Sequence, residues 1–260
     1  RQDDMSYEEC ADDLNRACAA IENCVGDTSI ALSQIADNGI VFEVKRDYAK
    51  DMVTGFIKLN GVTVGAVANR TAVLDENGKT TEKFDASLTT AGCEKAAAFV
   101  KFCDAFGIPV LTLTNVKGYE ATMCSEKGIA KAAAKLTYAF ANATVAKVNV
   151  IIGKAYGSAY VAMNSKAIGA DITMAWPNAE IGTMDAKLAA KIMYEGQGAD
   201  VIDEKAAEYA ALQTSALSAA KRGYVDQVVE AADTRKYVIG AFEMLFTKRE
   251  ERPAKKHGTI

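Results

Sequence analysis

The sequence predicts an α/β fold in which one sheet has mostly parallel strands. The first observation is that, after residue 94, helix-like and strand-like apolar segments alternate along the chain. The second is that the 260 residues include only three prolines and no low-complexity linker that would divide them. Half of the residues are apolar, so the chain can bury a large core. We therefore expect one large α/β domain.

The first residues predict a helix. Ser6 and Glu9 stand at the spacing of a capping box. Apolar residues succeed them at helical intervals, namely Leu14, Ala17, Cys18 and Ile21. We expect residues 1–36 to form a helical segment or linker, and residues 37–260 to form the domain.

A two-stranded unit is predicted next. Phe42 and Val44 suggest a short strand, and apolar runs at 53–59 and 62–67 flank Asn60-Gly61, a strong short hairpin signal. Residues 75–91 are polar around Asn77-Gly78 and predict a loop or a second turn.

Helices and strands alternate after this unit. Such an order predicts parallel pairing with right-handed crossovers. The predicted helices are 94–106, 126–141, 157–165, 203–219 and 233–246, and the predicted strands are 109–114, 147–152 and 172–175.

Net charge, apolar runs and cysteine spacing make several classes of function unfavoured. The formal charge is −4, so nucleic acid is an unfavoured partner, and no apolar run reaches the ~18 residues of a membrane span. The six cysteines include no C-x-x-C pair, which favours reduced thiols, a cytoplasmic location and no metal site.

The single histidine, His257, lies close to the end of the sequence. A Ser-His or Cys-His catalytic pair is therefore disfavoured. Any reaction should depend on backbone dipoles or on groups that a cofactor brings.

The segment 154–160 is the strongest candidate for chemistry. An apolar strand ends there, and the small residues Gly157, Ser158 and Ala159 open a helix. Backbone N–H groups at a helix N-terminus can stabilise an oxyanion. The same pattern also occurs in turns that are small only for packing. Ser158 as a hydrolase nucleophile is disfavoured, because its histidine partner and a G-x-S-x-G motif are both missing.

Ordered blocks of sequence resemble the carboxyltransferase β-subunits of biotin-dependent acyl-CoA carboxylases and decarboxylases, including the propionyl-CoA carboxylase, methylmalonyl-CoA decarboxylase and transcarboxylase types. The blocks cover nearly everything after residue 37 and include residues 61–69, 95–109, 154–160, 163–166, 169–171, 175–177, 179–181, 222–226, 233–235, 247–250 and 255–258.

The resemblance implies a crotonase-like α/β fold, in which ββα units wind into a right-handed superhelix. It identifies the chain with the second of the family's two related domains, the one that receives biotin. The implied activity is carboxyl transfer between biotin and a short-chain acyl-CoA, with propionyl-CoA or methylmalonyl-CoA as the expected substrate.

The resemblance also implies roles for individual residues. The amides of Ser158 and Ala159 match the backbone oxyanion hole for biotin, and Gly157 and Tyr156 shape that turn. The acyl pocket would be tuned at Val161. The residues that match the walls of the biotin site are Gly118, Gly128, Ile129, Ala179, Ile181 and Gly182.

The implied partners are a biotin carboxyl carrier protein or domain, an N-terminal acyl-CoA-binding carboxyltransferase domain, and further copies of the chain in a dimer or hexamer. A membrane decarboxylase complex is a possible setting. Without the acyl-CoA-binding domain, we expect this chain to be inactive.

This sequence departs from the family between residues 115 and 134, where Asn115 replaces a usual aspartate and Lys117 a usual proline. Two alternatives stay open. One is a crotonase-fold hydratase or isomerase, which would need a carboxylate pair such as Glu180 and Asp185 facing the turn. The other is a non-catalytic assembly module.

Overall fold

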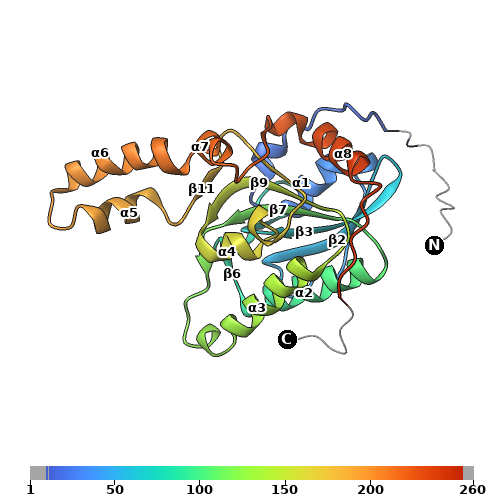
Figure 1. Cartoon of the computed structure of the whole chain (residues 1–260), viewed down its shortest axis with the longest axis horizontal. Helices are drawn as coiled ribbons and strands as arrows, with labels where there is room; N and C mark the ends of the chain where they lie inside the picture. Colours follow the sequence, from blue (N-terminus) through green and yellow to red (C-terminus); the bar gives the residue numbers. More distant parts are fainter. Residues whose placement is uncertain (1–9, 11, 254–260) are drawn as a thin grey trace.

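The computed structural model describes residue 10 and residues 12–253 of the chain (Figure 1). An eight-stranded sheet lies at its centre, with the order β1-β2-β3-β7-β9-β10-β12 and with β11 paired to β9. These strands are β1 (Val41–Glu43), β2 (Met52–Leu59), β3 (Val62–Asn69), β7 (Val110–Val116), β9 (Lys147–Tyr156), β10 (Ile172–Ala175), β11 (Glu180–Gly182) and β12 (Gln227–Val228).

The pairing confirms the predicted hairpin and the predicted parallel strands. Strands β1, β2 and β3 pair antiparallel, and Leu59 lies opposite Val62. Asn60 and Gly61 both have positive φ, as a two-residue hairpin turn requires. From β3 onward, β7, β9, β10 and β12 pair in parallel.

Two small sheets flank this centre. Strands β4 (Ala72–Leu74) and β5 (Thr80–Lys83) form a hairpin around the predicted turn at Gly78. These strands were not predicted, because β5 is polar and mostly exposed. Strands β6 (Ser87–Leu88) and β8 (Gly118–Tyr119) pair in parallel.

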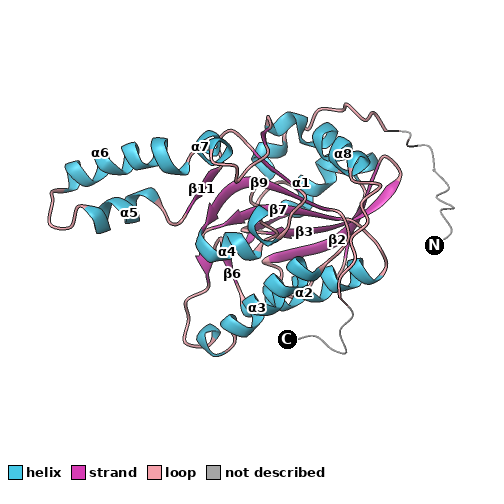
Figure 2. Cartoon of the chain, in the orientation of Figure 1, coloured by secondary structure: helices cyan, strands magenta, loops and turns pink. Residues whose placement is uncertain are grey.

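Helices cover both faces of the central sheet (Figure 2). The helices are α1 (Thr28–Ile35), α2 (Thr90–Ala105), α3 (Ile129–Asn142), α4 (Gly157–Ala162), α5 (Ala186–Met193), α6 (Ala199–Tyr209), α7 (Ala216–Lys221) and α8 (Thr234–Met244). Helices α2, α3 and α4 contribute to one apolar cluster, and α1 and α8 contribute to a second.

Side chains of the central strands alternate between these two clusters. Leu111 and Leu113 of β7 belong to the cluster with α1 and α8, whereas Val110 and Val116 belong to the cluster with α2 and α3. A strand buried on both faces has a nearly continuous apolar sequence, and for this reason β7 and β9 could be predicted.

The predicted N-terminal helix is wrong over the described residues. Ser6 and Glu9 lie outside them, and residues 12–20 form turns and irregular backbone. The backbone N–H of Cys18 donates to Ala232 at 2.8 Å, and Arg16 donates to the carbonyls of Gln34 and Ala36. These tertiary hydrogen bonds replace the helical ones.

The helices that do form within the first 36 residues lie later than predicted. A single 3₁₀ turn covers Ile21–Cys24, and α1 comes next with Asp27 as its N-cap. Helix α1 buries Leu32 and Ile35 in the same apolar cluster as α8.

The predicted helix 203–219 is two helices. It breaks at Ser215, whose backbone is extended and bridges Glu180, and whose hydroxyl accepts from the N–H of Ser218 at the start of α7. Helix α5 was not predicted. Together with α6 it projects from the body of the molecule (Figure 1).

None of the helices within the described residues combines the length and the apolar character that crossing a membrane requires.

Candidate active site

The turn from β9 into α4 has the predicted strand-turn-helix geometry. Tyr156 ends β9 with an extended backbone and is the N-cap of α4. Gly157 comes next with φ +60°, and a Cβ there would lie 3.2 Å from the carbonyl oxygen of Thr183. Glycine is therefore required for both the backbone conformation and the space.

The first two residues of α4 after Gly157 differ in exposure, since Ser158 is exposed and Ala159 is buried. Within the described part of the chain, no side chain caps this helix. The N–H groups of Ser158 and Ala159 stand in its first turn, where an α-helix supplies no intrahelical acceptor. Two adjacent donors at the positive end of a helix can bind a negatively charged or polarised oxygen.

Tyr119 of β8 makes a hydrogen bond to the turn between β9 and α4. Its hydroxyl donates to the carbonyl oxygen of Ser158 at 3.2 Å. Burial raises the pKa of Tyr119, so the phenol remains a donor at neutral pH. This contact places Gly118 and Tyr119 beside the turn of residues 156–159, which we call the oxyanion turn after the role predicted for its amides.

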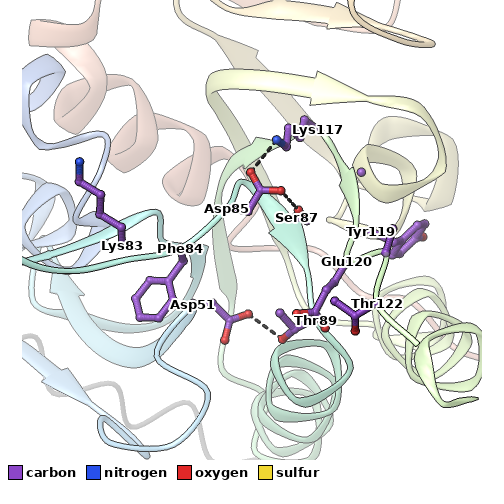
Figure 3. Close-up of a pocket in the computed structure, with 12 residues that line it drawn as sticks. Asp51, Lys83, Phe84, Asp85, Ser87, Thr89, Lys117, Tyr119, Glu120 and Thr122 are labelled. Atoms are coloured by element: carbon purple, nitrogen blue, oxygen red, sulfur yellow. Dashed lines mark hydrogen bonds and ion pairs between the residues drawn. The ribbon is translucent and has the colours of Figure 1, made fainter. Parts of the chain in front are cut away.

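A cavity of about 650 Å³ adjoins Tyr119 (Figure 3). Its wall is formed by the region after β5, by β6, by the start of α2 and by β8. The lining residues are Asp51, Lys83, Phe84, Asp85, Ser87, Thr89, Lys117, Gly118, Tyr119, Glu120, Ala121 and Thr122.

Two charged groups in this wall form an ion pair. Lys117 lies 2.5 Å from Asp85, which also accepts a hydrogen bond from Ser87 (Figure 3). The hydrogen bond from Lys117 lowers the pKa of Asp85. Asp51 accepts from the hydroxyl of Thr89 at 2.7 Å. The wall contains the acidic residues Asp51, Asp85 and Glu120 and the basic residues Lys83 and Lys117, so opposite charges nearly balance in it.

Strand β11 supports the oxyanion turn. Gly182 lies opposite Tyr156 and Ile181 lies opposite Ala155 in the parallel pairing with β9. Ile181 and Ala179 are buried in the apolar cluster with α2 and α3. These predicted residues therefore stand beside the turn. Neither they nor the turn residues 156–159 themselves line the cavity.

The remaining predicted residues do not line the cavity either. Gly128 is the N-cap of α3, and a Cβ there would meet Thr90 at 3.2 Å. Ile129 begins α3 and packs on the apolar cluster. Val161 is half-buried on α4.

Tyr156 is held by Glu180, whose carboxylate accepts a hydrogen bond from the phenol. Burial and this hydrogen bond raise the pKa of Tyr156. Asp185 has a different task, because it accepts from the N–H groups of Lys187 and Leu188 as the N-cap of α5. Both carboxylates near the turn are thus occupied by structural contacts.

Sequence reasoning missed Tyr119 and the Asp85–Lys117 pair. The available signal was position: residues 117–119 come directly after β7 at its carboxyl end, which is the edge where α/β sheets bind ligands. Asp85 gave no such signal, because it lies after a strand that the sequence did not predict.

Comparison with known proteins places the chain in a family. Residues 9–260 match the family described as the carboxyl transferase domain. The chain is 43% identical to the putative propionyl-CoA carboxylase beta chain of Bacillus subtilis, over 95% of this chain and 48% of the relative. It is 41% identical to the methylmalonyl-CoA carboxyltransferase 12S subunit of Propionibacterium freudenreichii, over 90% of this chain and 44% of the relative.

The chain spans about half the length of the curated relatives that it matches. The solved structure of transcarboxylase 12S is similar with a TM-score of 0.87 and 38% identity, over 98% of this chain and 49% of that one. This likeness confirms the α/β, crotonase-like fold. The chain is a member of the carboxyl transferase domain family.

Proposed function

We propose that this chain provides the biotin side of an active site that transfers a carboxyl group between biotin and a short-chain acyl-CoA. The observation that carries this proposal is the pair of uncapped amides at Ser158 and Ala159, in a turn that Tyr119 links to a cavity of about 650 Å³ through its hydrogen bond to the Ser158 carbonyl. The named relatives, a propionyl-CoA carboxylase chain and a methylmalonyl-CoA carboxyltransferase subunit, support propionyl-CoA or methylmalonyl-CoA as the substrate.

The residues present fit biotin. A ureido carbonyl oxygen is an acceptor, and two adjacent amides at the start of α4 are matching donors. Gly157 places no side chain at the start of α4, and the cavity beside Tyr119 has room for a bicyclic ring. Biotin would supply the ureido nitrogen that carries the carboxyl group.

In the proposed reaction, the role of this chain is to stabilise negative charge. The amides of Ser158 and Ala159 hold negative charge that develops on the ureido oxygen, and Tyr119 fixes the peptide between them through the Ser158 carbonyl. No side chain of the turn needs to accept a proton. The serine hydroxyl therefore has no catalytic task in this proposal.

The proposed reaction needs two further components. An acyl-CoA-binding carboxyltransferase domain would hold the acyl-CoA, and a biotin carrier protein or domain would deliver biotin. The solved transcarboxylase 12S is described as a hexamer assembly, which supports a homo-oligomer here. All six cysteines are free thiols, which supports the cytoplasmic location that we propose.

A hydratase or isomerase is disfavoured. That activity needs a carboxylate pair facing the oxyanion turn, but Glu180 binds Tyr156 and Asp185 caps α5.

The test combines this chain with an acyl-CoA-binding carboxyltransferase domain and measures carboxyl transfer from methylmalonyl-CoA or malonyl-CoA to free biotin. Ser158→Pro removes one amide donor in the first turn of α4, where the N–H has no intrahelical acceptor to lose, and transfer should fall about 100-fold. Ser158→Ala keeps the amide and is the matched control, so it should retain transfer. Equal loss in both variants, or no transfer in any such mixture, contradicts the proposal.

A further inference from the structure

Strand β9 bulges just before the oxyanion turn. Thr114 of β7 lies opposite Ile151, whereas Val116 lies opposite Ala155. An advance of two residues along β7 thus matches an advance of four along β9, and the extra length falls at residues 152–154. A bulge bends its strand and changes the direction of the chain beyond it. The segment directly beyond this bulge is the turn that carries Ser158 and Ala159.

Asn115 of β7 occupies the centre of this bulge. Its side-chain Oδ1 accepts from the backbone N–H of Lys154 at 2.9 Å. The irregular register deprives that N–H of a regular partner on β7, and the asparagine side chain takes its place. Gly153 makes the approach possible, because a Cβ there would lie 2.6 Å from Oδ1.

Asn69, the last residue of β3, fixes Asn115 in turn. The backbone pairing of β3 with β7 ends at Ala68 and Leu113. Beyond it, the Oδ1 of Asn69 accepts from the N–H of Asn115 at 2.8 Å, and its Nδ2 donates to the carbonyl of Asn115. Asn69 is almost fully buried. Two side-chain amides therefore continue the hydrogen bonding across three strands.

We infer that Asn115 is a positioning residue for carboxyl transfer: by holding Lys154 in the β9 bulge, it sets the direction in which the oxyanion turn presents its amides. This inference rests on the proposed function of that turn. Asn115 acts through the backbone of β9 and does not itself need to touch a ligand.

Three variants test the inference. Asn115→Leu removes the acceptor at nearly equal volume, and Asn115→Asp keeps an oxygen in the same place. Gly153→Ala forces the asparagine away without changing it. Asn77→Leu, at an exposed asparagine in the β4–β5 turn, is the matched control.

The first readout is amide hydrogen exchange and amide chemical shift, measured by NMR on this chain alone. We expect Asn115→Leu and Gly153→Ala to speed exchange at Lys154 and to shift the Ser158 and Ala159 resonances. Asn115→Asp and Asn77→Leu should leave them close to wild type. Unchanged resonances at Ser158 and Ala159 in Asn115→Leu overturn the inference.

The second readout is transfer to free biotin with the acyl-CoA-binding domain present. Displacement of a catalytic group by about 1 Å costs up to about 100-fold, so kcat should fall about 10- to 100-fold in Asn115→Leu. The KM for acyl-CoA should not change, and Asn115→Asp should restore kcat to within about threefold. A wild-type kcat in Asn115→Leu overturns the inference. An inactive wild-type mixture, with the NMR effects intact, overturns the proposed function instead.

Discussion

The guanidinium of Arg235 donates a hydrogen bond to the carboxylate of Asp37 at 2.7 Å, across 198 positions of sequence. Both side chains are buried. Arg235 also donates to the carbonyls of Ile35 and Asp13, and Asp37 also accepts from the N–H groups of the hairpin turn at Asn60 and Gly61. One ion pair thereby joins three elements: the start of α8, the end of α1 and the β2–β3 hairpin.

Arg235→Ala should lower the free energy of unfolding by about 3–5 kcal/mol, because it leaves the Asp37 carboxylate buried without its charge partner. Chemical denaturation measures this change. Arg222→Ala removes an exposed arginine and is the control. A loss below about 1 kcal/mol in Arg235→Ala would show that water replaces the guanidinium.

Gly157→Ala should reduce transfer to biotin and cost about 1–2 kcal/mol of stability, since φ is +60° and the new Cβ meets the Thr183 carbonyl. Gly196→Ala is a matched control, because Gly196 also has positive φ but has no atom within 4 Å of the new Cβ. Kinetic assays and thermal unfolding of both variants separate strain from function. Equal transfer by the two variants would contradict the role of Gly157.

Tyr119→Phe removes the hydrogen bond to the Ser158 carbonyl and should lower kcat for transfer about two- to tenfold. A net hydrogen bond contributes about 0.5–1.5 kcal/mol, which corresponds to that range. Tyr224→Phe, at an exposed tyrosine, should have no effect. Steady-state kinetics decide the outcome, and an unchanged kcat in Tyr119→Phe would rule out this contact as a support of the turn.

Lys95 should give a pH-dependent contribution to stability. Burial lowers the pKa of Lys95 from 10.5 to about 8, while its Nζ donates to the carbonyl of Tyr48 at 2.7 Å. Between pH 8 and 10.5 the unfolded chain binds a proton that the folded chain has released, so the stability contributed at this site rises with pH.

The stability of wild type relative to Lys95→Met should therefore increase by up to about 3 kcal/mol from pH 8 to pH 10.5. Denaturation at several pH values measures the difference. Lys101→Met, at an exposed lysine of the same helix, controls for the loss of one positive charge. A difference that stays flat or falls over this range would contradict the prediction.

Local signals predicted much of the fold. Asn60-Gly61 specifies a hairpin by itself, because its two residues tolerate the positive φ that the turn needs. The apolar runs of β7 and β9 are long enough to indicate buried parallel strands. The β9–α4 turn was predicted because Gly157, Ser158 and Ala159 stand directly after such a run.

The parts of the structure that could not be predicted from the sequence depend on tertiary contacts. Cys18 and Arg16 hold residues 12–20 in a non-helical path through bonds to Ala232, Gln34 and Ala36, and nothing near residue 18 announces them. The cavity wall also depends on contacts between residues that are distant in sequence. Asp85 meets Lys117 only because the short strands β6 and β8 pair in parallel.

The donors of the oxyanion turn belong to the main chain, and this has a consequence for how the site tolerates mutation. Every amino acid except proline carries an amide hydrogen, so substitutions at the exposed position 158 can leave the donors intact, whereas Ala159 is buried in the apolar cluster and accepts only a small side chain. Gly153 and Gly157 have no such freedom, since an added Cβ at either meets an oxygen atom. A deep mutational scan should therefore find intolerance at these two glycines and at Ala159 but tolerance at Ser158, and a search for sensitive polar side chains would overlook the site.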